Sequence, residues 1–270
     1  MIVFPNAKIN IGLHITSKRP DGFHNIETVF YPVPLNDVLE IIPNDSPNIE
    51  FSNFGIEIPG NTENNLCIKA YQALRADFDL PHVKIILQKN IPMGAGMGGG
   101  SSDGAFTLVV LNKMFNLGLT ELQLEQYASK LGSDCAFFIR NKPALGSEKG
   151  NVLENIAVNL QGLYLVIVKP NVHIGTAEAY AGVTPQIPEL SLKEITSLPV
   201  NQWKELIKND FEDSIFPKHA EIKEIKDNLY KNGALYASMT GSGAAVFGIF
   251  EQEVDLKNLF KGMFYWGAKL

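Results

Sequence analysis

The chain has 270 residues, of which 45% are apolar and 19% are charged, a composition that excludes an intrinsically disordered protein. Its net charge is −6, because 29 Asp and Glu outnumber 23 Lys and Arg, and this balance argues against a general nucleic-acid binder with a basic face. The length suits one large domain or two small lobes that share a cleft.

Cysteine and histidine spacing indicates neither a disulfide framework nor a structural zinc site. Cys67 and Cys135 lie far apart, and the five histidines show no paired spacing, so we expect a protein of a reducing cytoplasm. No window reaches 18 uninterrupted apolar residues, and no basic segment precedes an apolar stretch at the N-terminus. We therefore expect no signal peptide, no transit peptide and no membrane span.

The first predicted element is a half-buried strand at residues 6–16, where apolar and polar side chains alternate. The alternation places Lys8 and Asn10 together on the face away from the core. A Pro-Asp-Gly turn at 20–22 follows this strand. Further strands and a helix come next, with the strands expected at residues 26–33, 37–42 and 83–88 and the helix at 64–78.

A central helix is predicted at residues 102–115, since this segment is apolar on nearly every face, as a buried helix would be. Thr120 and Gln123 form a possible capping box for the next helix, and Gly132 is a natural stop. The apolar run 135–139, which follows Ser133 and Asp134, reads as a strand.

The second half repeats the mixture of strands and helices. We expect a strand at 163–168, a proline-containing surface connection at 184–199 and helices within 201–231, broken near Pro217. A glycine turn then leads into a last strand beyond residue 243. The coarse prediction is an α+β or α/β protein with two lobes and a boundary near residue 155.

The most informative segment is a loop with five glycines within residues 94–100, followed by Ser101, Ser102 and the apolar helix. Glycine allows positive φ and a close approach of a ligand to the backbone. A loop that ends at a helix N-terminus offers unpaired N–H groups and the positive end of the helix dipole, which suits phosphate. The second glycine turn, Thr240–Gly243, is either a plain turn or another backbone nest for an anion.

Three familiar phosphate-binding patterns do not fit this loop. It lacks the lysine of a P-loop, because Gly100 is followed by two serines. Gly94, Gly96 and Gly99 satisfy a dinucleotide pattern, but no strand ending in an acidic residue follows about 20 residues later. The sequence motifs of protein kinases are also missing.

Other candidate residues do not decide the function one at a time. Asp134, between a helix stop and an apolar run, is equally compatible with a cap and with a functional acid. Lys8 in a strand is more often a solvated edge charge, and His24 is more often a turn residue than a ligand. Phe23 and Tyr180 are by default packing aromatics.

Together, these segments resemble the GHMP family of small-molecule kinases. The matching parts are the strand Pro5–Asn10, the loop Pro92–Ser102 and the turn Thr240–Gly243. The segments Arg19–His24 and Leu131–Phe138 narrow the resemblance to the branch that phosphorylates a cytidine-diphosphate sugar alcohol on the non-mevalonate route to isoprenoids. The match runs in order from residue 4 to residue 248.

The resemblance implies a role for each matching residue. Asp134 would be the catalytic base, and Lys8 its partner at the reacting hydroxyl. Eleven residues would wrap the ATP phosphates: Pro92, Met93, Gly94, Ala95, Gly96, Met97, Gly98, Gly99, Gly100, Ser101 and Ser102. Six would contact the acceptor substrate: Asn10, Phe23, His24, Tyr180, Thr240 and Gly241. Among these, Phe23 and Tyr180 would sandwich the cytosine ring while His24 reads its polar edge.

The resemblance also implies the fold and the cofactors. The fold would be α+β, with an N-terminal ATP-binding lobe (1–155) containing a left-handed βαβ unit and a C-terminal ferredoxin-like lobe (156–270). ATP would be the co-substrate, and Mg²⁺ would be bound through the ATP phosphates and Ser101 or Ser102. Phe23 stands where tyrosine is usual, which keeps the stacking face and loses a hydroxyl.

Three other functions remain as alternatives. One is a different GHMP kinase, of the homoserine or mevalonate type, and another is a catalytically silent ligand sensor with the same fold. The third is a dinucleotide-dependent oxidoreductase. In each case we expect a small-molecule ligand, no nucleic acid, no membrane, and a monomer or weak homodimer.

Overall fold

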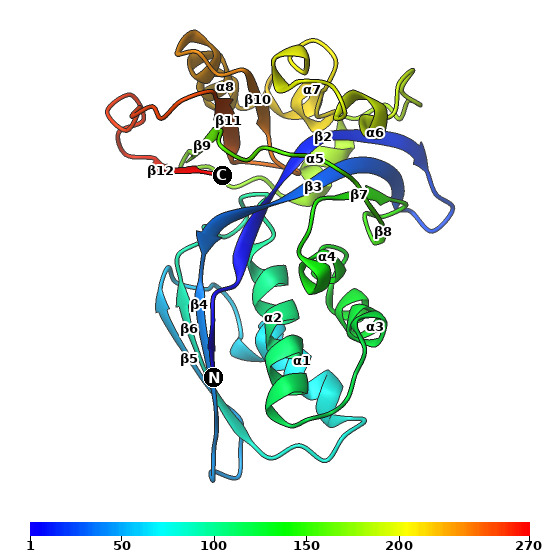
Figure 1. Cartoon of the computed structure of the whole chain (residues 1–270), viewed down its shortest axis with the longest axis vertical. Coiled ribbons are helices and arrows are strands. Elements are labelled where there is room, and N and C mark those ends of the chain that lie inside the picture. Colours follow the sequence, from blue (N-terminus) through cyan, green and yellow to red (C-terminus); the bar gives the residue numbers. More distant parts are fainter. The chain divides into compact units, whose positions relative to one another are not determined.

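The computed structural model describes every residue from Met1 to Leu270 and contains both helices and strands (Figure 1). The strands are β1 (Ile2–Val3), β2 (Asn6–Lys18), β3 (His24–Asn36), β4 (Val38–Pro43), β5 (Glu50–Gly55), β6 (Val83–Lys89), β7 (Ala144–Ser147), β8 (Val152–Asn155), β9 (Tyr164–Lys169), β10 (Tyr236–Met239), β11 (Val246–Phe250) and β12 (Phe264–Lys269). The α-helices are α1 (Leu66–Arg75), α2 (Gly99–Met114), α3 (Glu121–Leu131), α4 (Cys135–Arg140), α5 (Thr176–Ala181), α6 (Leu192–Ile195), α7 (Phe211–Ile215) and α8 (Ala220–Lys231). Two 3₁₀ turns, η1 (Thr62–Asn64) and η2 (Val200–Gln202), complete the elements.

The chain forms two compact units that interleave along the sequence. The first unit consists of residues 1–7, 35–93 and 98–142, and the second of residues 8–34, 94–97 and 143–270. The glycine-rich loop is divided between them, since residues 94–97 belong to the second unit and residue 98 onward to the first. The predicted boundary near residue 155 divides the chain into two lobes that are each continuous in sequence, and it stays a prediction.

In the first unit, a four-stranded sheet is covered by helices. Its strand order is β1-β4-β6-β5, and β5 and β6 run parallel with α1 in the connection between them. This is the βαβ unit that the resemblance implies. The strand expected at 83–88 is β6, whose odd-numbered residues from Val83 to Lys89 are buried while the others are half-buried. α1 and α2 lie on one side of this sheet (Figure 1).

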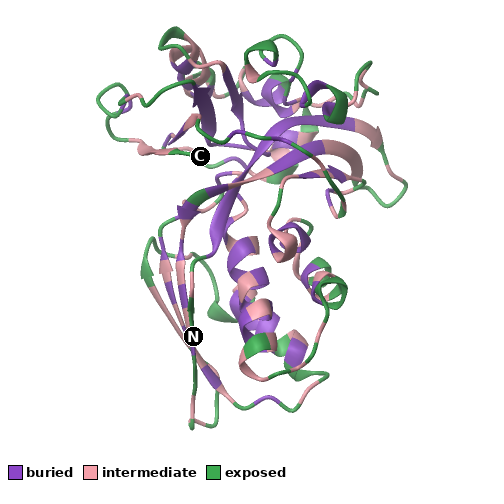
Figure 2. Ribbon diagram, in the orientation of Figure 1, coloured by how far each residue is buried: buried purple, intermediate pink, exposed green.

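Helix α2 is the buried centre of the first unit, as its apolar composition predicts. It contacts α1, α3 and α4, so few of its faces meet solvent. Figure 2 shows buried residues along most of its length. The capping box is confirmed, since the Thr120 side chain accepts from the backbone N–H of Gln123 and the Gln123 side chain accepts from that of Thr120. Gly132 is the C-cap of α3 but is extended, with φ 174°.

The second unit contains two antiparallel sheets. One has the order β2-β3-β7-β8, and its strand β2 is buried from Asn6 to Ile15. The other has the order β10-β11-β9-β12. Numbered along the chain from β9, this second order is 2-3-1-4, which read in reverse is the 4-1-3-2 order of a ferredoxin-like βαββαβ fold. Irregular turns replace the second helix between β11 and β12.

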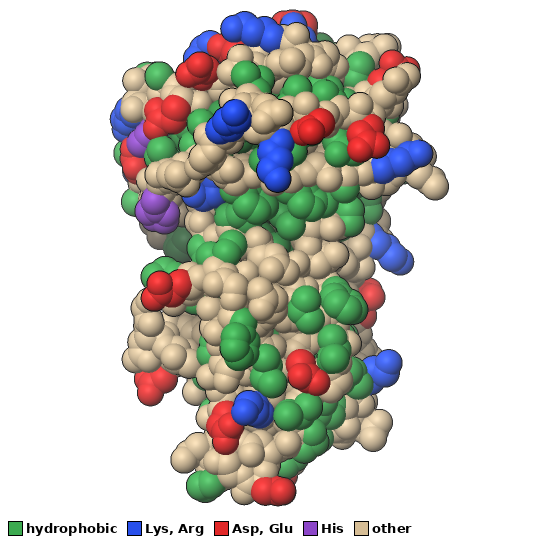
Figure 3. Space-filling model, turned by 90° about the vertical axis from the view of Figure 1, so that its left-hand side faces the viewer, with side chains coloured by type: hydrophobic (Ala, Val, Ile, Leu, Met, Phe, Trp, Pro, Cys, Tyr) green, Lys and Arg blue, Asp and Glu red, His purple; other side chains and the backbone are tan.

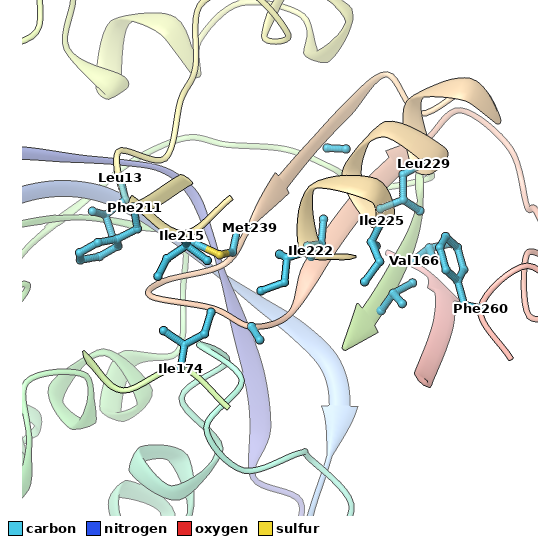
Figure 4. Packing of buried hydrophobic residues seen from close by; sticks show 14 of the residues in the cluster. Leu13, Val166, Ile174, Phe211, Ile215, Ile222, Ile225, Leu229, Met239 and Phe260 are labelled. Atoms are coloured by element: carbon cyan, nitrogen blue, oxygen red, sulfur yellow. The ribbon is translucent and has the colours of Figure 1, made fainter. Parts of the chain in front are cut away.

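The second unit contains a large apolar cluster around helix α8 and the sheet with strands β9 to β12. The amphipathic helix α8 packs Ile222, Ile225 and Leu229 toward Val166 of β9 (Figure 4). Met239, at the end of β10, belongs to the same cluster. Burial of a side chain of this size contributes about 1.5–3 kcal/mol, so the cluster rigidly supports the turn that follows Met239.

One predicted element has the wrong type. Residues 135–139 were expected to form a strand, but they form helix α4, and Cys135, Ala136, Phe137 and Phe138 are all buried. A short apolar run buried on every side has no period that distinguishes a strand from a helix. The sequence-based reading also omits the short strands β1, β5, β7, β8, β10 and β12 and the short helices α5 and α6. Helix α6 lies within the segment 184–199, which was expected to be a surface connection.

Surface and helix properties agree with the composition. No helix combines the length and the apolar character needed to cross a lipid bilayer. On the face shown in Figure 3, acidic and basic side chains are intermingled with apolar ones, and neither sign forms a continuous patch.

Candidate active site

The segment Gly94–Met97 packs directly against the second glycine turn, Thr240–Gly243. Gly96 has φ 73°, and a Cβ at this position would lie 1.9 Å from the carbonyl oxygen of Thr240. Only glycine fits there. The backbone N–H of Ala245 also donates to the carbonyl of Ala95 at 3.3 Å. The two glycine-rich segments, distant in sequence, therefore form one piece of structure.

Lys8 is buried beside this piece and is not a solvated edge charge. It is 2% exposed, and its Nζ donates to Asn10 Oδ1 at 2.5 Å and to the carbonyl oxygen of Gly96 at 2.9 Å. The ring of Phe30 lies 5.2 Å from Nζ, and the backbone N–H of Lys8 donates to the Met97 carbonyl at 3.0 Å. A buried ammonium with such neighbours is oriented toward the glycine-rich loop.

Asn10 and Thr240 are buried partners of Lys8. Thr240 Oγ1 accepts from the backbone N–H of Asn10 at 3.0 Å and lies 3.0 Å from the Gly96 carbonyl oxygen. Asn209, fully buried, donates from Nδ2 to the carbonyls of Met239 and Gly241 at 2.7 and 2.9 Å. Both carbonyls are thus held by one side chain, which fixes the conformation of the turn.

The structure brings two of the three predicted cytosine-binding residues into contact. The rings of His24 and Tyr180 stack with centroids 4.7 Å apart and an interplanar angle of 16°. Tyr180 also meets Phe211 edge-on at 4.8 Å. Phe23 is 58% exposed, with the Nζ of Lys149 at 4.9 Å from its ring. An exposed aromatic beside a cation is unusual for a packing residue and is available to a ligand.

In the first unit, helix α2 begins at the loop without a side-chain cap. Its N-cap, Gly98, is left-handed with φ 69°, and the first helical N–H groups have no intrahelical acceptor. A cavity of about 380 Å³ lies beside this end of the helix. The cavity is lined by Ile58, Pro59, Gly60, Asn61, Asn64, Asn65, Leu66, Lys89, Met93, Gly100 and Asp103. Its size is in the range of small-molecule sites.

A buried charge cluster lies at the wall of this cavity. Lys89 Nζ donates to Asp37 and, at 2.9 Å, to Asp103 Oδ2, and all three side chains are almost fully buried. Burial raises the pKa of Asp103 to about 7, against the attraction of Lys89 and together with the charge of Asp37. Asp37 Oδ1 also accepts from the N–H groups of Asn90 and Ile91 at 2.6 and 2.8 Å. The cluster connects the end of β6 to the second turn of α2.

Asp134 lies at the N-terminus of α4 and does not act as its side-chain cap. The next residue, Cys135, is buried, and desolvation raises the pKa of its thiol to about 12 against a hydrogen bond with Ser101. The charge of Asp134 acts in the same direction as the burial. Ser101, at the start of α2, and Asp134 are therefore both neighbours of Cys135 within the first unit.

The hydroxyl of Ser102 bears on the predicted Mg²⁺. Its Oγ is buried and has no protein hydrogen-bond partner. Asp103 Oδ1 is also buried without such a partner. No group of three His, Cys, Asp or Glu side chains could hold a metal ion. This donor set suits a magnesium ion bound mainly through phosphates with one hydroxyl from the protein.

Sequence reasoning missed several residues that surround these positions: Asp37, Lys89 and Asp103 in the first unit, and Thr28, Asn209 and Glu212 in the second. Glu212 accepts from the backbone N–H of Met239 at 2.9 Å and so supports the turn from the other side. None of these residues falls in a glycine-rich motif. Asp103 alone offered a signal, since a carboxylate in an otherwise apolar helix needs a buried partner.

Two family models and several relatives match this chain. The model of the GHMP kinases N-terminal domain matches residues 65–142, and that of the GHMP kinases C-terminal domain matches residues 192–267. A relative from Bacteroides thetaiotaomicron is 55% identical over 95% of this chain and 94% of its own length. One from Parabacteroides distasonis is 51% identical over the full length of both chains. Both are named 4-diphosphocytidyl-2-C-methyl-D-erythritol kinase.

Solved structures agree with this. A crystal structure of 4-(cytidine 5'-diphospho)-2C-methyl-D-erythritol kinase has a TM-score of 0.79 and 29% identity, covering 92% of this chain and 90% of the other. A Methanococcus jannaschii mevalonate kinase, 15% identical with a TM-score of 0.71, shares the fold. The chain belongs to the GHMP kinase family, among the relatives named 4-diphosphocytidyl-2-C-methyl-D-erythritol kinase.

Proposed function

We propose that the protein transfers the γ-phosphoryl group of ATP to the 2-hydroxyl of 4-diphosphocytidyl-2-C-methyl-D-erythritol. The products are the 2-phosphate and ADP, and the reaction serves the synthesis of isoprenoid precursors by the non-mevalonate route. The observation that carries the proposal is the bond from Lys8 Nζ to the Gly96 carbonyl, which joins a buried ammonium to a loop suited to phosphate. The names of the close relatives supply the substrate.

The nucleotide would bind where the glycine-rich loop enters α2. The unpaired N–H groups of the first helical turn and the positive end of the helix dipole favour the phosphates. The neighbouring cavity of about 380 Å³, with apolar Ile58, Leu66 and Met93 in its wall, would take the adenosine. Gly100 leaves open space for a close approach, because no atom lies within 4 Å of its Cβ position.

Mg²⁺ fits the residues present, and Ser102, whose buried hydroxyl has no protein partner, would hold it together with the phosphates. The ion would supply charge neutralisation on the transferring phosphoryl oxygens. The protein's own part is to orient the nucleotide and exclude water, which the glycine backbone and the buried helix α2 accomplish.

Asp134 and Lys8 would perform the proton transfer and charge stabilisation. An alcohol is a poor nucleophile at neutral pH, so a carboxylate must take its proton as the O–P bond forms. Asp134 is assigned this role by its place in the segment Leu131–Phe138, which resembles the family. Lys8, held by Asn10 and Gly96, would stabilise the negative charge that develops on the attacking oxygen.

The cytosine ring would be recognised by Phe23, His24 and Tyr180. The exposed face of Phe23 offers a stacking surface worth roughly 1–3 kcal/mol for a base. Because His24 stacks on Tyr180, a base that enters between Phe23 and Tyr180 must displace the imidazole, which then becomes free to bind the polar edge.

A coupled assay for ADP release tests the proposal. With the purified chain, ATP and Mg²⁺, the cytidyl methylerythritol substrate should give turnover, whereas homoserine and mevalonate should give none above background. Turnover with homoserine or mevalonate alone would assign the chain to another branch of the family. Absence of transfer to all three acceptors would favour a ligand sensor. A rise in melting temperature with NAD(P) instead of ATP would favour a dinucleotide enzyme.

A further inference from the structure

We infer that Thr28 is a positioning residue for Lys8 and acts by setting the orientation of the Asn10 amide. The inference rests on the proposed function, since Lys8 is assigned there to the reacting oxygen. It concerns a hydroxyl on β3 that belongs to none of the sequence motifs. All of the residues involved lie in the second unit.

The direction of the Thr28 hydrogen bonds follows from chemistry alone. Thr28 is fully buried, and its Oγ1 lies 2.7 Å from the Gly12 carbonyl oxygen and 2.9 Å from the Asn10 side-chain amide. A carbonyl oxygen only accepts, so the single hydroxyl proton must point to Gly12. The hydroxyl can then only accept from Asn10, which must present its NH₂ group to Thr28.

The carbonyl end of the Asn10 amide is thereby aimed at Lys8. Asn10 Oδ1 lies 2.5 Å from Lys8 Nζ and 3.2 Å from Thr240 Oγ1. The reversed amide would set its NH₂ group against an ammonium that has only donors to offer. The buried hydroxyl of Thr28 therefore favours the amide orientation in which Lys8 meets an acceptor.

The position of Thr28 is itself determined by the strands around it. Gly12 has φ 71° in the middle of β2, and its Cβ position is filled by side-chain atoms of Leu192 and Ile207, at 2.6 and 2.7 Å. A residue with positive φ interrupts regular strand geometry, and the Gly12 carbonyl is satisfied by Thr28. On the other side, Thr28 pairs with Gly146 of β7, which holds its backbone in register.

The same geometry changes the expected part of Asn10. Its side chain is 2% exposed, its oxygen accepts from Lys8 and lies 3.2 Å from Thr240 Oγ1, and its NH₂ group donates to Thr28. A buried amide held in this way acts on the reaction through the groups that it contacts. Thr28 thus orients the Asn10 amide, and the Asn10 amide orients Lys8. This chain of two hydrogen bonds is called the relay below.

Variants of Thr28 test this relay in the ADP-release assay. Thr28→Val keeps the side-chain shape and removes the hydroxyl, so kcat should fall by roughly 10-fold to 10²-fold, while KM for ATP changes by less than about twofold. Thr28→Ser keeps the hydroxyl and should recover kcat to within about threefold of the wild type. Thr28→Ala replaces the valine variant if that variant does not fold.

Thr196→Val is the matched control. Thr196 is buried in the same unit and also donates to a backbone carbonyl, that of Leu192, at 2.6 Å. Both valine variants lose one buried hydroxyl-to-carbonyl bond, and Thr28→Val also removes the acceptor of the Asn10 amide. The melting temperature should therefore fall in both variants, further in Thr28→Val, but only Thr28→Val should lose kcat. Equal kcat in the two valine variants would overturn the inference, and so would failure of Thr28→Ser to recover kcat.

A second readout does not depend on turnover. In ¹⁵N NMR spectra, the side-chain amide protons of Asn10 should exchange slowly with solvent in the wild type and in Thr28→Ser, and faster in Thr28→Val. Unchanged exchange in Thr28→Val would refute the relay even if activity fell. If the wild type transfers no phosphate while this exchange pattern holds, the proposed function fails and the relay stands.

Discussion

Replacing Gly96 by alanine tests whether the close contact between the glycine-rich loop and Thr240 is needed for stability and activity. A control variant accounts for the separate cost of a positive φ at alanine. The added Cβ would lie 1.9 Å from the Thr240 carbonyl oxygen, whereas ordinary contact begins at 3.4 Å. One of the two segments must therefore move by about 1.5 Å, the difference between these distances. Such a shift would break the bond from Lys8 Nζ to the Gly96 carbonyl.

Gly118→Ala is the matched control for the free-energy cost of a positive φ at alanine. Gly118 has φ 71°, almost the same as the 73° of Gly96, and nothing lies within 4 Å of its Cβ position. Positive φ at alanine costs about 1–2 kcal/mol in both variants, and for a chain of this size each kcal/mol lowers Tm by roughly 2–4 °C.

The Tm of Gly96→Ala should therefore be lower than the Tm of Gly118→Ala. The kcat/KM of Gly96→Ala should also fall by at least about 10²-fold, because a displacement near 1 Å has effects of that order. Gly118→Ala should keep the wild-type kcat/KM. Equal Tm values for the two variants, or wild-type turnover by Gly96→Ala, would show that the close contact with Thr240 is not needed.

Three further outcomes follow from the site. Asp134→Asn should lower kcat by at least roughly 10²-fold with little change in ATP affinity, as measured by ADP release and ATP titration, and near-normal turnover would remove the base assignment. Phe23→Ala should raise KM for the cytidyl substrate more than KM for ATP, whereas equal changes would make Phe23 a structural residue only. The pKa of Asp103 is raised by burial to about 7, so the folded protein holds a proton that the unfolded chain releases above its ordinary value of 3.8. The free energy of unfolding should then fall as the pH rises from about 4 to 7, and Asp103→Asn should flatten that part of the curve in urea titrations; an unchanged slope would contradict this.

Local features of the chain were predictable because they depend on neighbours in sequence. The capping box of Thr120 and Gln123 satisfies groups three residues apart, and both partners are visible in the sequence. The strand at β2 and the helix α1 follow from the period of their apolar residues, and α2 follows from a long segment that is apolar on nearly every face. The strand predicted at 135–139 was wrong because that short apolar run has no period that distinguishes a strand from a helix.

The environment of Lys8 could not be predicted from its own segment. Alternation in β2 correctly placed Lys8 and Asn10 on one face, and that pattern most often means a solvated edge charge. In the structure, the ammonium is buried by Gly96, which lies 88 residues further along the chain. The Asn10 amide is likewise oriented by Thr28 of the next strand.

The residues alone determined a glycine-rich loop before a buried helix, because glycine content and apolar composition act within a few residues. The burial of Lys8, the cluster of Lys89 with Asp37 and Asp103, and the contact of the two glycine turns were decided only by the tertiary structure. Each joins residues that are distant in the chain, and the balance between desolvation and pairing exists only once folding has brought them together.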